Sequence, residues 1–151
     1  MKIRAAEKND INELADLLKQ LFSIEEDFIF DGVKQKRGLE LLLNSDLARI
    51  FVAEEAGVVI GMVSGQLVIS TAEGGVSLLI EDMIVDRQHR GNGIGKELLQ
   101  KAGEWSRGKG AYRMQLLADH DNHRAFSFYE RAEWDRTNLV CLRKYNKDTS
   151  K

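Results

Sequence analysis

The feature that most constrains the fold is a glycine-rich loop between an apolar segment and an amphipathic one. Residues 76–85 carry apolar side chains at both odd and even positions, which predicts a central strand buried on both faces. Residues 93–108 repeat apolar side chains at helical spacing, which predicts a helix with one buried face. The loop that joins them contains Gly91, Gly93 and Gly95. A strand, a loop and a helix in this order predict an α/β domain.

The chemistry of this loop favours an anion as its ligand. Glycines let a ligand approach the backbone N–H groups, and the first turn of a helix adds unpaired donors and a partial positive charge. Arg90 and Lys96 place two full positive charges beside the glycines. The alternative is a helix start whose glycines serve tight packing alone.

Two common nucleotide-binding motifs do not fit this loop. A P-loop requires G-x-x-x-x-G-K followed by Ser or Thr, but Arg90 occupies the first glycine position and Glu97 follows Lys96. A dinucleotide-binding fingerprint requires G-x-G-x-x-G, and Lys96 stands at its last position. An activity that depends on ATP or NAD is therefore disfavoured.

The length and the pattern of elements predict one domain. We expect residues 1–145 of the 151 to form it, with a polar tail at 146–151. The expected order is β-α-α-β-β-β-α-β-α-β, an α/β domain with a mixed sheet. Strands are expected at residues 1–5, 48–54, 58–69, 76–85, 112–118 and 134–143, and helices at 11–22, 33–43, 93–108 and 122–131. Asp10 is expected to cap the first helix in a capping box with Glu13.

Composition narrows the expected partners and location. The net charge of −2 gives no general attraction to nucleic acid or to anionic membranes, so neither is expected as a partner. The single cysteine, Cys141, excludes an internal disulfide framework and is expected as a small buried side chain in the last strand. No signal segment or bilayer-spanning stretch is visible, so a cytoplasmic protein is the expectation.

Two motifs resemble those of the GNAT superfamily of N-acetyltransferases. Residues 90–95 are similar to its R-x-x-G-x-G signature, and residues 122–129 are similar to its N-x-x-A-x-x-F-Y helix. The resemblance covers nearly the whole chain, and residues 80–85 with the Phe128-Tyr129 pair look closest to diamine and polyamine acetyltransferases. It implies a GNAT-like fold with a mostly antiparallel sheet flanked by helices. It also implies acetyl-CoA as co-substrate, with no metal.

The resemblance assigns cofactor contacts to particular residues. The strand backbone would pair with the pantetheine arm, and the helix near the C-terminus would contact the arm and the nucleotide. These residues are Met83, Ile84 and Val85 on the strand, and Asn122, Phe128 and Arg131 on the helix. The pyrophosphate would be wrapped by Gln88, Arg90, Gly91, Asn92, Gly93, Ile94, Gly95 and Lys96.

The resemblance also implies a direct transfer of the acetyl group to a primary amine in a ternary complex. Only roughly one such amine in 2,500 is unprotonated at pH 7, so a base is needed, and Glu81 matches the family's strand carboxylate, acting directly or through water. A backbone N–H near Ile84 would stabilise the oxyanion. Tyr129 matches the tyrosine that protonates the leaving thiolate. The pKa of a thiol is about 8.5 and that of a phenol about 10, so this proton transfer carries no large penalty.

Several alternatives remain open at this level. A small amine or polyamine is the preferred acceptor because the chain shows no extra docking segment, and a protein lysine or N-terminus is the alternative. A non-catalytic acyl-CoA-binding sensor on the same scaffold is the alternative from another class. Many family members dimerise through C-terminal strands, so a homodimer is among the expectations. The family pattern after the tyrosine has glycine and phenylalanine where this chain has Glu133 and Trp134, which predicts a reshaped turn.

Other polar residues have simpler interpretations. Residues 119–123 (D-H-D-N-H) are expected to cap a helix rather than to bind a metal, although His120 could line the substrate entrance. Residues 25–27 (E-E-D) form an acidic loop that, in the GNAT interpretation, would border the acceptor site. Glu81 and Asp82 are expected on opposite faces of their strand, and His89 in a solvated loop.

Overall fold

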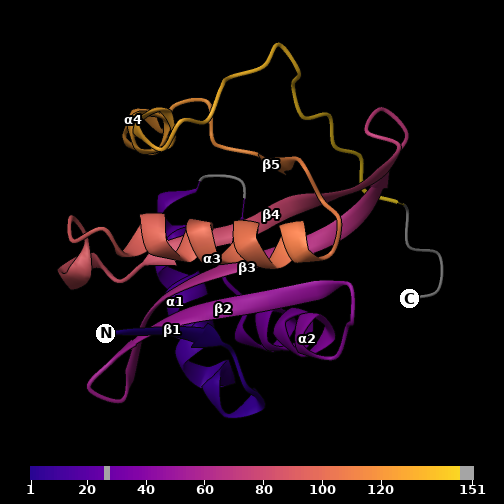
Figure 1. Ribbon diagram of the computed structural model, residues 1–151. Coiled ribbons are helices and arrows are strands. Elements are labelled where there is room, and N and C mark those ends of the chain that lie inside the picture. The colour runs from indigo at the N-terminus through magenta and orange to yellow at the C-terminus, as the bar shows by residue number, and fades with distance from the viewer. Residues whose placement is uncertain (26–27, 147–151) are drawn as a thin grey trace. The chain divides into compact units, whose positions relative to one another are not determined.

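The structure is a computed structural model that describes residues 1–25 and 28–146 (Figure 1). The chain divides into two compact units, Met1–Leu116 and the residues from Leu117 onward, and each is described by itself. The first unit contains a five-stranded sheet of order β1-β2-β3-β4-β5. Its neighbours are antiparallel except for β4 and β5, which are parallel. The expectation of a mixed, mostly antiparallel sheet is confirmed.

The elements follow the expected order up to the second helix of the C-terminal half. The strands are β1 (Lys2–Ala5), β2 (Ala48–Glu55), β3 (Val58–Ser70), β4 (Gly75–Val85) and β5 (Met114–Leu116). The helices are α1 (Ile11–Ile24), α2 (Gly32–Leu43), α3 (Ile94–Gly108) and α4 (His123–Arg131), with the 3-10 turns η1 (Lys8–Asp10) and η2 (Arg87–His89). None of the described helices is both long and apolar enough to cross a membrane.

Side-chain alternation along β2 assigns the helices of the first unit to opposite faces of the sheet. Ile50 and Val52 pack in one core with buried leucines of α1 and with Leu39 of α2. Phe51 lies between them on the strand and meets Trp105 of α3, with ring centroids 6.4 Å apart. Helices α1 and α2 therefore cover one face, and α3 covers the other (Figure 1).

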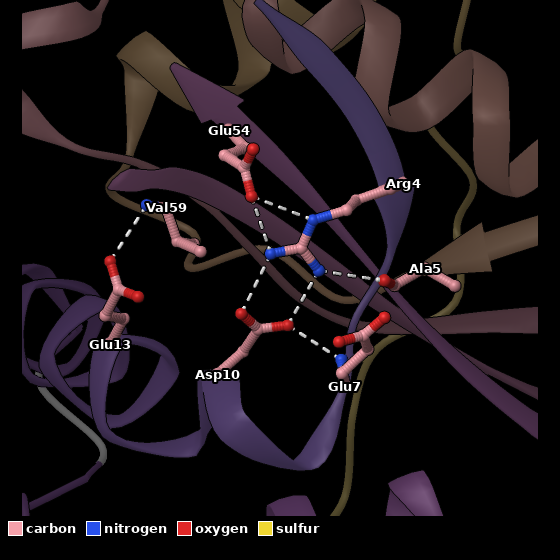
Figure 2. Close-up of polar contacts among 7 residues, drawn as sticks. All are labelled: Arg4, Ala5, Glu7, Asp10, Glu13, Glu54 and Val59. Atoms are coloured by element: carbon pink, nitrogen blue, oxygen red, sulfur yellow. Dashed lines mark hydrogen bonds and ion pairs between the residues drawn. The ribbon is translucent and has the colours of Figure 1, made fainter. Parts of the chain in front are cut away.

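A guanidinium group ties the N-terminal strand to the first turn and to β2. Figure 2 shows Arg4 between two carboxylates, with bonds of 2.8 and 2.9 Å to Asp10 and of 3.0 and 2.9 Å to Glu54. Asp10 also accepts from the backbone N–H of Glu7, and Glu13 accepts from the backbone N–H of Val59. The predicted capping box between Asp10 and Glu13 is therefore wrong, because Arg4 and Glu7 donate to Asp10 and Val59 donates to Glu13.

The structure changes the expected strands of the C-terminal half. Residues 134–143 form no strand, although their sequence favours one, because a strand requires a neighbouring backbone with which to pair. Leu139, Val140 and Leu142 are exposed there, and Cys141 is exposed rather than buried. The strand expected at 112–118 is limited to β5, which pairs with only three residues of β4.

Candidate active site

Two adjacent carboxylates enter the same cavity because β4 carries a bulge. Ser64 on β3 pairs with Asp82, and the next residue, Gly65, pairs with Ile80, so Glu81 is the extra residue of β4. The sequence predicts opposite faces for Glu81 and Asp82, as in a regular strand. That prediction is wrong, since both side chains line one cavity.

Asp82 is the more perturbed of the two carboxylates. The hydroxyl of Ser64, which is fully buried, donates to Asp82 Oδ2 at 2.8 Å and accepts from the backbone N–H of Asp82 at 3.1 Å. Burial raises the pKa of Asp82 to about 6, the charge of Glu81 adds to the rise, and the hydrogen bond from Ser64 opposes it. A carboxylate with a pKa near 6 is well matched to accepting a proton at neutral pH.

The cavity that holds these carboxylates has a volume of about 450 Å³. This lies within the range of roughly 300–1,000 Å³ that is usual for small-molecule sites. Helices α1 and α2 supply an apolar wall that includes Leu18, Phe22 and Leu39. The polar lining residues other than the carboxylates are Lys34, Gln35, Ser45 and Gln66. Another cavity, of about 330 Å³ beside Glu7 and Asn44, contains none of the predicted site residues.

The edge of β4 that follows the carboxylates extends beyond its parallel neighbour. Among the strands that the structure describes, β5 pairs with β4 only from Leu78 to Ile80. On its other side, β4 stays paired with β3 as far as Val85. Residues 81–85 therefore have one edge that pairs with no described strand, and such an edge can accept an extended ligand as an added strand.

The backbone direction shows which residues face this edge. The N–H of Asp86 donates to the carbonyl of Ile60 on β3 at 2.8 Å. The carbonyl of Val85 belongs to the same peptide group and points the opposite way, toward the open edge. Since backbone groups alternate with a period of two, the N–H and C=O of Met83 also face the open edge, whereas those of Ile84 face β3.

The glycine loop follows at the end of β4. Gly91 and Gly93 adopt left-handed φ angles of 83° and 79°, and a Cβ built on either would meet nothing within 4 Å. The backbone there is therefore open to a ligand, as an approaching phosphate requires. The Nε of Arg90 donates to the carbonyl of Val85 at 2.8 Å, and Lys96 is exposed in the first turn of α3. These residues fit a pyrophosphate.

The other predicted loop residues divide into buried and exposed ones. Ile94 and Gly95 are buried at the start of α3, where they fix the helix against the sheet. Gln88 in η2 and Asn92 in the loop are exposed. The side-chain amide of Asn92 donates to the carbonyl of His89 at 3.1 Å, which closes the turn ahead of the glycines.

The second unit brings together the predicted residues of the C-terminal motif. The side-chain oxygen of Asn122 caps α4 by accepting from the N–H of Ala125 at 3.0 Å. The rings of Phe128 and Tyr129 meet edge to face with centroids 5.1 Å apart, and Trp134 lies 5.5 Å from Tyr129. Arg131 is exposed in the last turn of α4.

The turn that ends α4 accommodates Glu133, which stands where the family pattern has glycine. Trp134 N–H donates to the carbonyl of Tyr129 and Glu133 N–H donates to that of Glu130, the two bonds of a Schellman motif. Glu133 adopts a φ of 67°, in the left-handed region that favours glycine. The predicted reshaping of the turn is therefore wrong: the turn keeps the shape that a glycine would give, and glutamate adopts it at a cost in backbone strain.

The polar residues ahead of α4 and after α1 have simple surroundings. Asp119 accepts from the N–H of Asp121, and the described residues include no group of three or more His, Cys, Asp and Glu side chains that could hold a metal. His120 is exposed and lies 3.1 Å from Asp121. Glu25 follows α1 directly, and Glu26 and Asp27 lie outside the described residues.

His89 differs from its expected role as a solvated loop residue. It is about one-third exposed and lies between two carboxylates, 3.0 Å from Asp86 and 3.6 Å from Glu55. The Ser64 contact that shapes the environment of Asp82 was also not predicted. Its sequence signal was Gly65, because a glycine in the middle of a strand is typical of a bulge or a close backbone approach.

Comparisons with known proteins agree with this geometry. The sequence profile of the Acetyltransferase (GNAT) family matches residues 11–134. A glucosamine 6-phosphate N-acetyltransferase from Trypanosoma brucei brucei is 27% identical over 139 residues, which cover 87% of this chain and 86% of that protein. An uncharacterized N-acetyltransferase from Archaeoglobus fulgidus is 28% identical over 131 residues, covering 85% and 89%. The structure of an aminoglycoside N-acetyltransferase in complex with CoA superposes with a TM-score of 0.84 at 19% identity, over 97% of this chain and 95% of the other. The chain belongs to the GNAT family of acetyltransferases and is an acetyl-CoA-dependent N-acetyltransferase.

Proposed function

We propose that the acceptor is the primary amine of a small molecule, with small amines and polyamines preferred. The observation that carries this proposal is the cavity of about 450 Å³ in which Glu81 and Asp82 meet an apolar wall from α1 and α2. Two carboxylates attract the ammonium form of an amine, and the apolar wall accommodates its carbon chain. The similarity to an enzyme named for glucosamine 6-phosphate also favours a small-molecule acceptor.

Acetyl-CoA is held, in this proposal, by the open edge of β4 and by the glycine loop. When bound, it supplies the thioester carbonyl that the amine attacks. The backbone of Met83 pairs with the pantetheine arm, because its N–H and C=O face the open edge. The N–H groups of residues 91–95 and the charge of Lys96 bind the pyrophosphate. Met83 lies on β4, the strand that carries the two carboxylates, and the glycine loop follows the end of that strand.

The two carboxylates divide the work of binding and deprotonating the amine. Asp82, with its pKa raised to about 6, accepts the proton, and Glu81 holds the ammonium until then. Glu81 is the base in the interpretation based on the family motif alone. The raised pKa and the buried hydrogen bond to Ser64 favour Asp82 in this chain.

Residues of the second unit enter the proposal through their motif. Tyr129 donates the proton that the leaving thiolate needs, since a phenol is acidic enough to protonate a thiolate without a large penalty. The packing of its ring against Phe128 and Trp134 restricts its orientation. The side-chain oxygen of Asn122 caps α4, so its amide N–H groups are the part that would donate to the arm of acetyl-CoA. Phe128 would pack against that arm, and Arg131 would pair with the nucleotide phosphates.

The first experiment is calorimetric titration of acetyl-CoA into the purified protein, with ATP and NAD as controls. We expect acetyl-CoA to bind and the controls to give no heat. A thiol-release assay then compares putrescine, spermidine, glucosamine 6-phosphate and a lysine peptide. Turnover of the peptide with none of the small amines would contradict the proposed acceptor class.

Variants separate the proposed roles. Tyr129→Phe should lower kcat by about 10²–10⁴-fold while acetyl-CoA binding stays within about twofold. Tyr112→Phe is the matched control, because Tyr112 is 90% exposed and outside the proposed site. Glu81→Gln removes a charge that raises the pKa of Asp82, so the acid limb of the kcat profile should move to lower pH. Complete loss of turnover in Glu81→Gln, with the same activity in Asp82→Asn as in the wild type, would assign the base to Glu81 instead.

A further inference from the structure

A side chain of α1 forms hydrogen bonds with the residues that precede the glycine loop. Gln20 Nε2 donates to Asp86 Oδ1 at 2.8 Å, and Gln20 Oε1 accepts from the backbone N–H of Arg87 at 3.2 Å. One amide group therefore contacts two successive residues at the junction of β4 and η2. Gln20 is separated from these residues by more than sixty positions in the chain, so the contact joins distant segments.

Asp86 relays this contact into the turn ahead of the glycines. Its Oδ2 accepts from the N–H of Gln88 at 3.1 Å and lies 3.0 Å from His89 Nδ1. The hydrogen bonds from Gln20 and His89 hold the pKa of Asp86 below its usual range, so the group stays a carboxylate at neutral pH. The carbonyl of His89 in turn accepts from Asn92, which lies between Gly91 and Gly93.

A glycine loop has a particular need for such support. Glycine loses more conformational freedom on ordering than any other residue, and here Gly91 and Gly93 must both hold left-handed angles. A loop that is ordered before its ligand arrives does not take that entropy from the binding free energy. We infer that Gln20 and Asp86 are positioning residues that hold the glycine loop in the conformation that binds acetyl-CoA. This inference rests on the proposed assignment of the loop to the pyrophosphate.

The hydrogen-bond chemistry of the pair allows a swap experiment. Gln20→Glu places a second carboxylate beside Asp86, and Asp86→Asn places an amide donor opposite the amide donor of Gln20. In the double variant Gln20→Glu/Asp86→Asn, the new carboxylate accepts from the new amide and still accepts from the N–H of Arg87. The oxygen of the new amide still accepts from the N–H of Gln88.

The measurements are calorimetric titration of acetyl-CoA, steady-state kinetics and thermal unfolding of all three variants. We expect each single variant to raise the Kd and KM for acetyl-CoA about tenfold with kcat within about twofold. The double variant should return to within about threefold of wild type, because the pair interacts directly. Gln20→Met keeps the length of the side chain without its hydrogen bonds and replaces Gln20→Glu if that variant does not fold. Asp16→Asn is the control, since Asp16 is an exposed residue of the same helix.

The outcomes distinguish this inference from the proposed function. Acetyl-CoA binding by the wild type with unchanged Kd in the single variants would overturn the positioning role alone. A Kd for acetyl-CoA that rises about a hundredfold in the double variant, as two independent tenfold effects would give, would overturn it as well. If the wild type does not bind acetyl-CoA, the proposed assignment of the loop fails, and the positioning role fails with it.

Discussion

Asp82 should lower the stability of the protein at neutral pH. Its pKa is about 6 in the folded state, against 3.8 for an ordinary aspartate. Between these two values the folded state binds a proton that the unfolded state has released, so stability falls as the pH rises through this window. The interval corresponds to about 3 kcal/mol at 1.36 kcal/mol per pKa unit. Because the side chain borders an open cavity, we expect about 2 kcal/mol.

The substitution that isolates this effect is Asp82→Asn. An amide oxygen at this position still accepts from the hydroxyl of Ser64, and the backbone N–H still donates to that hydroxyl. The variant therefore removes the charge and little else. At pH 7.5 its free energy of unfolding should exceed that of the wild type by about 2 kcal/mol, which raises Tm by about 4–8 °C for a chain of this size. At pH 4 the gain should nearly vanish, because Asp82 is then protonated in the folded wild type. The same variant should lose most amine acetylation.

Urea denaturation and thermal melts of both proteins at several pH values between 4 and 7.5 provide the test. Taking the difference between the two proteins cancels the titration of carboxylates that do not interact with Asp82. Asp16→Asn, on the exposed face of α1, controls for the loss of one negative charge. A gain of equal size at every pH, or a loss of stability at pH 7.5, would refute the reasoning. A stabilised variant with full activity would leave the stability argument intact but remove Asp82 from the chemistry.

Three further substitutions test other parts of the structure. Glu133→Gly should raise the free energy of unfolding by about 1 kcal/mol in urea denaturation, because it relieves a left-handed residue at the end of α4. Gly93→Ala should cost about 1 kcal/mol for the same reason and raise the Kd for acetyl-CoA at least tenfold by titration, since its Cβ enters the space open to the ligand. Arg4→Met should cost about 3 kcal/mol at pH 7 by leaving the buried Asp10 unpaired, and the cost should shrink below about pH 4 as Asp10 protonates in both states.

Local sequence pattern was sufficient for most of the fold. Six elements begin and end within two residues of the predicted positions: helices α1, α2 and α3 and strands β2, β3 and β4. Each carries a clear apolar pattern and a turn or cap at its ends. The glycine loop was also predicted, since its left-handed residues require glycine.

Pairing between distant segments was the part that local pattern could not supply. Residues 134–143 have the composition of a strand but form no β-ladder with any described strand, and no local signal distinguishes the two cases. The same limit applies to Gln20, whose partners Asp86 and Arg87 are identified only once α1 lies beside the end of β4. The errors therefore lie where a residue's structure depends on a partner far along the chain.

The carboxylate pair shows how one residue of register determines the chemistry of a site. With regular pairing, Glu81 and Asp82 would lie on opposite faces, and one of them would be remote from the cavity. Gly65 lies at this register shift, and a Cβ there would come within 2.7 Å of the buried Leu78 side chain, which would have to move. The glycine therefore suits the packing beside the bulge, and the bulge brings two carboxylates to one cavity. Burial and the charge of Glu81 then raise the pKa of Asp82, so the placement of the proposed base comes from the register of β4 and its pKa from the surroundings that this register provides.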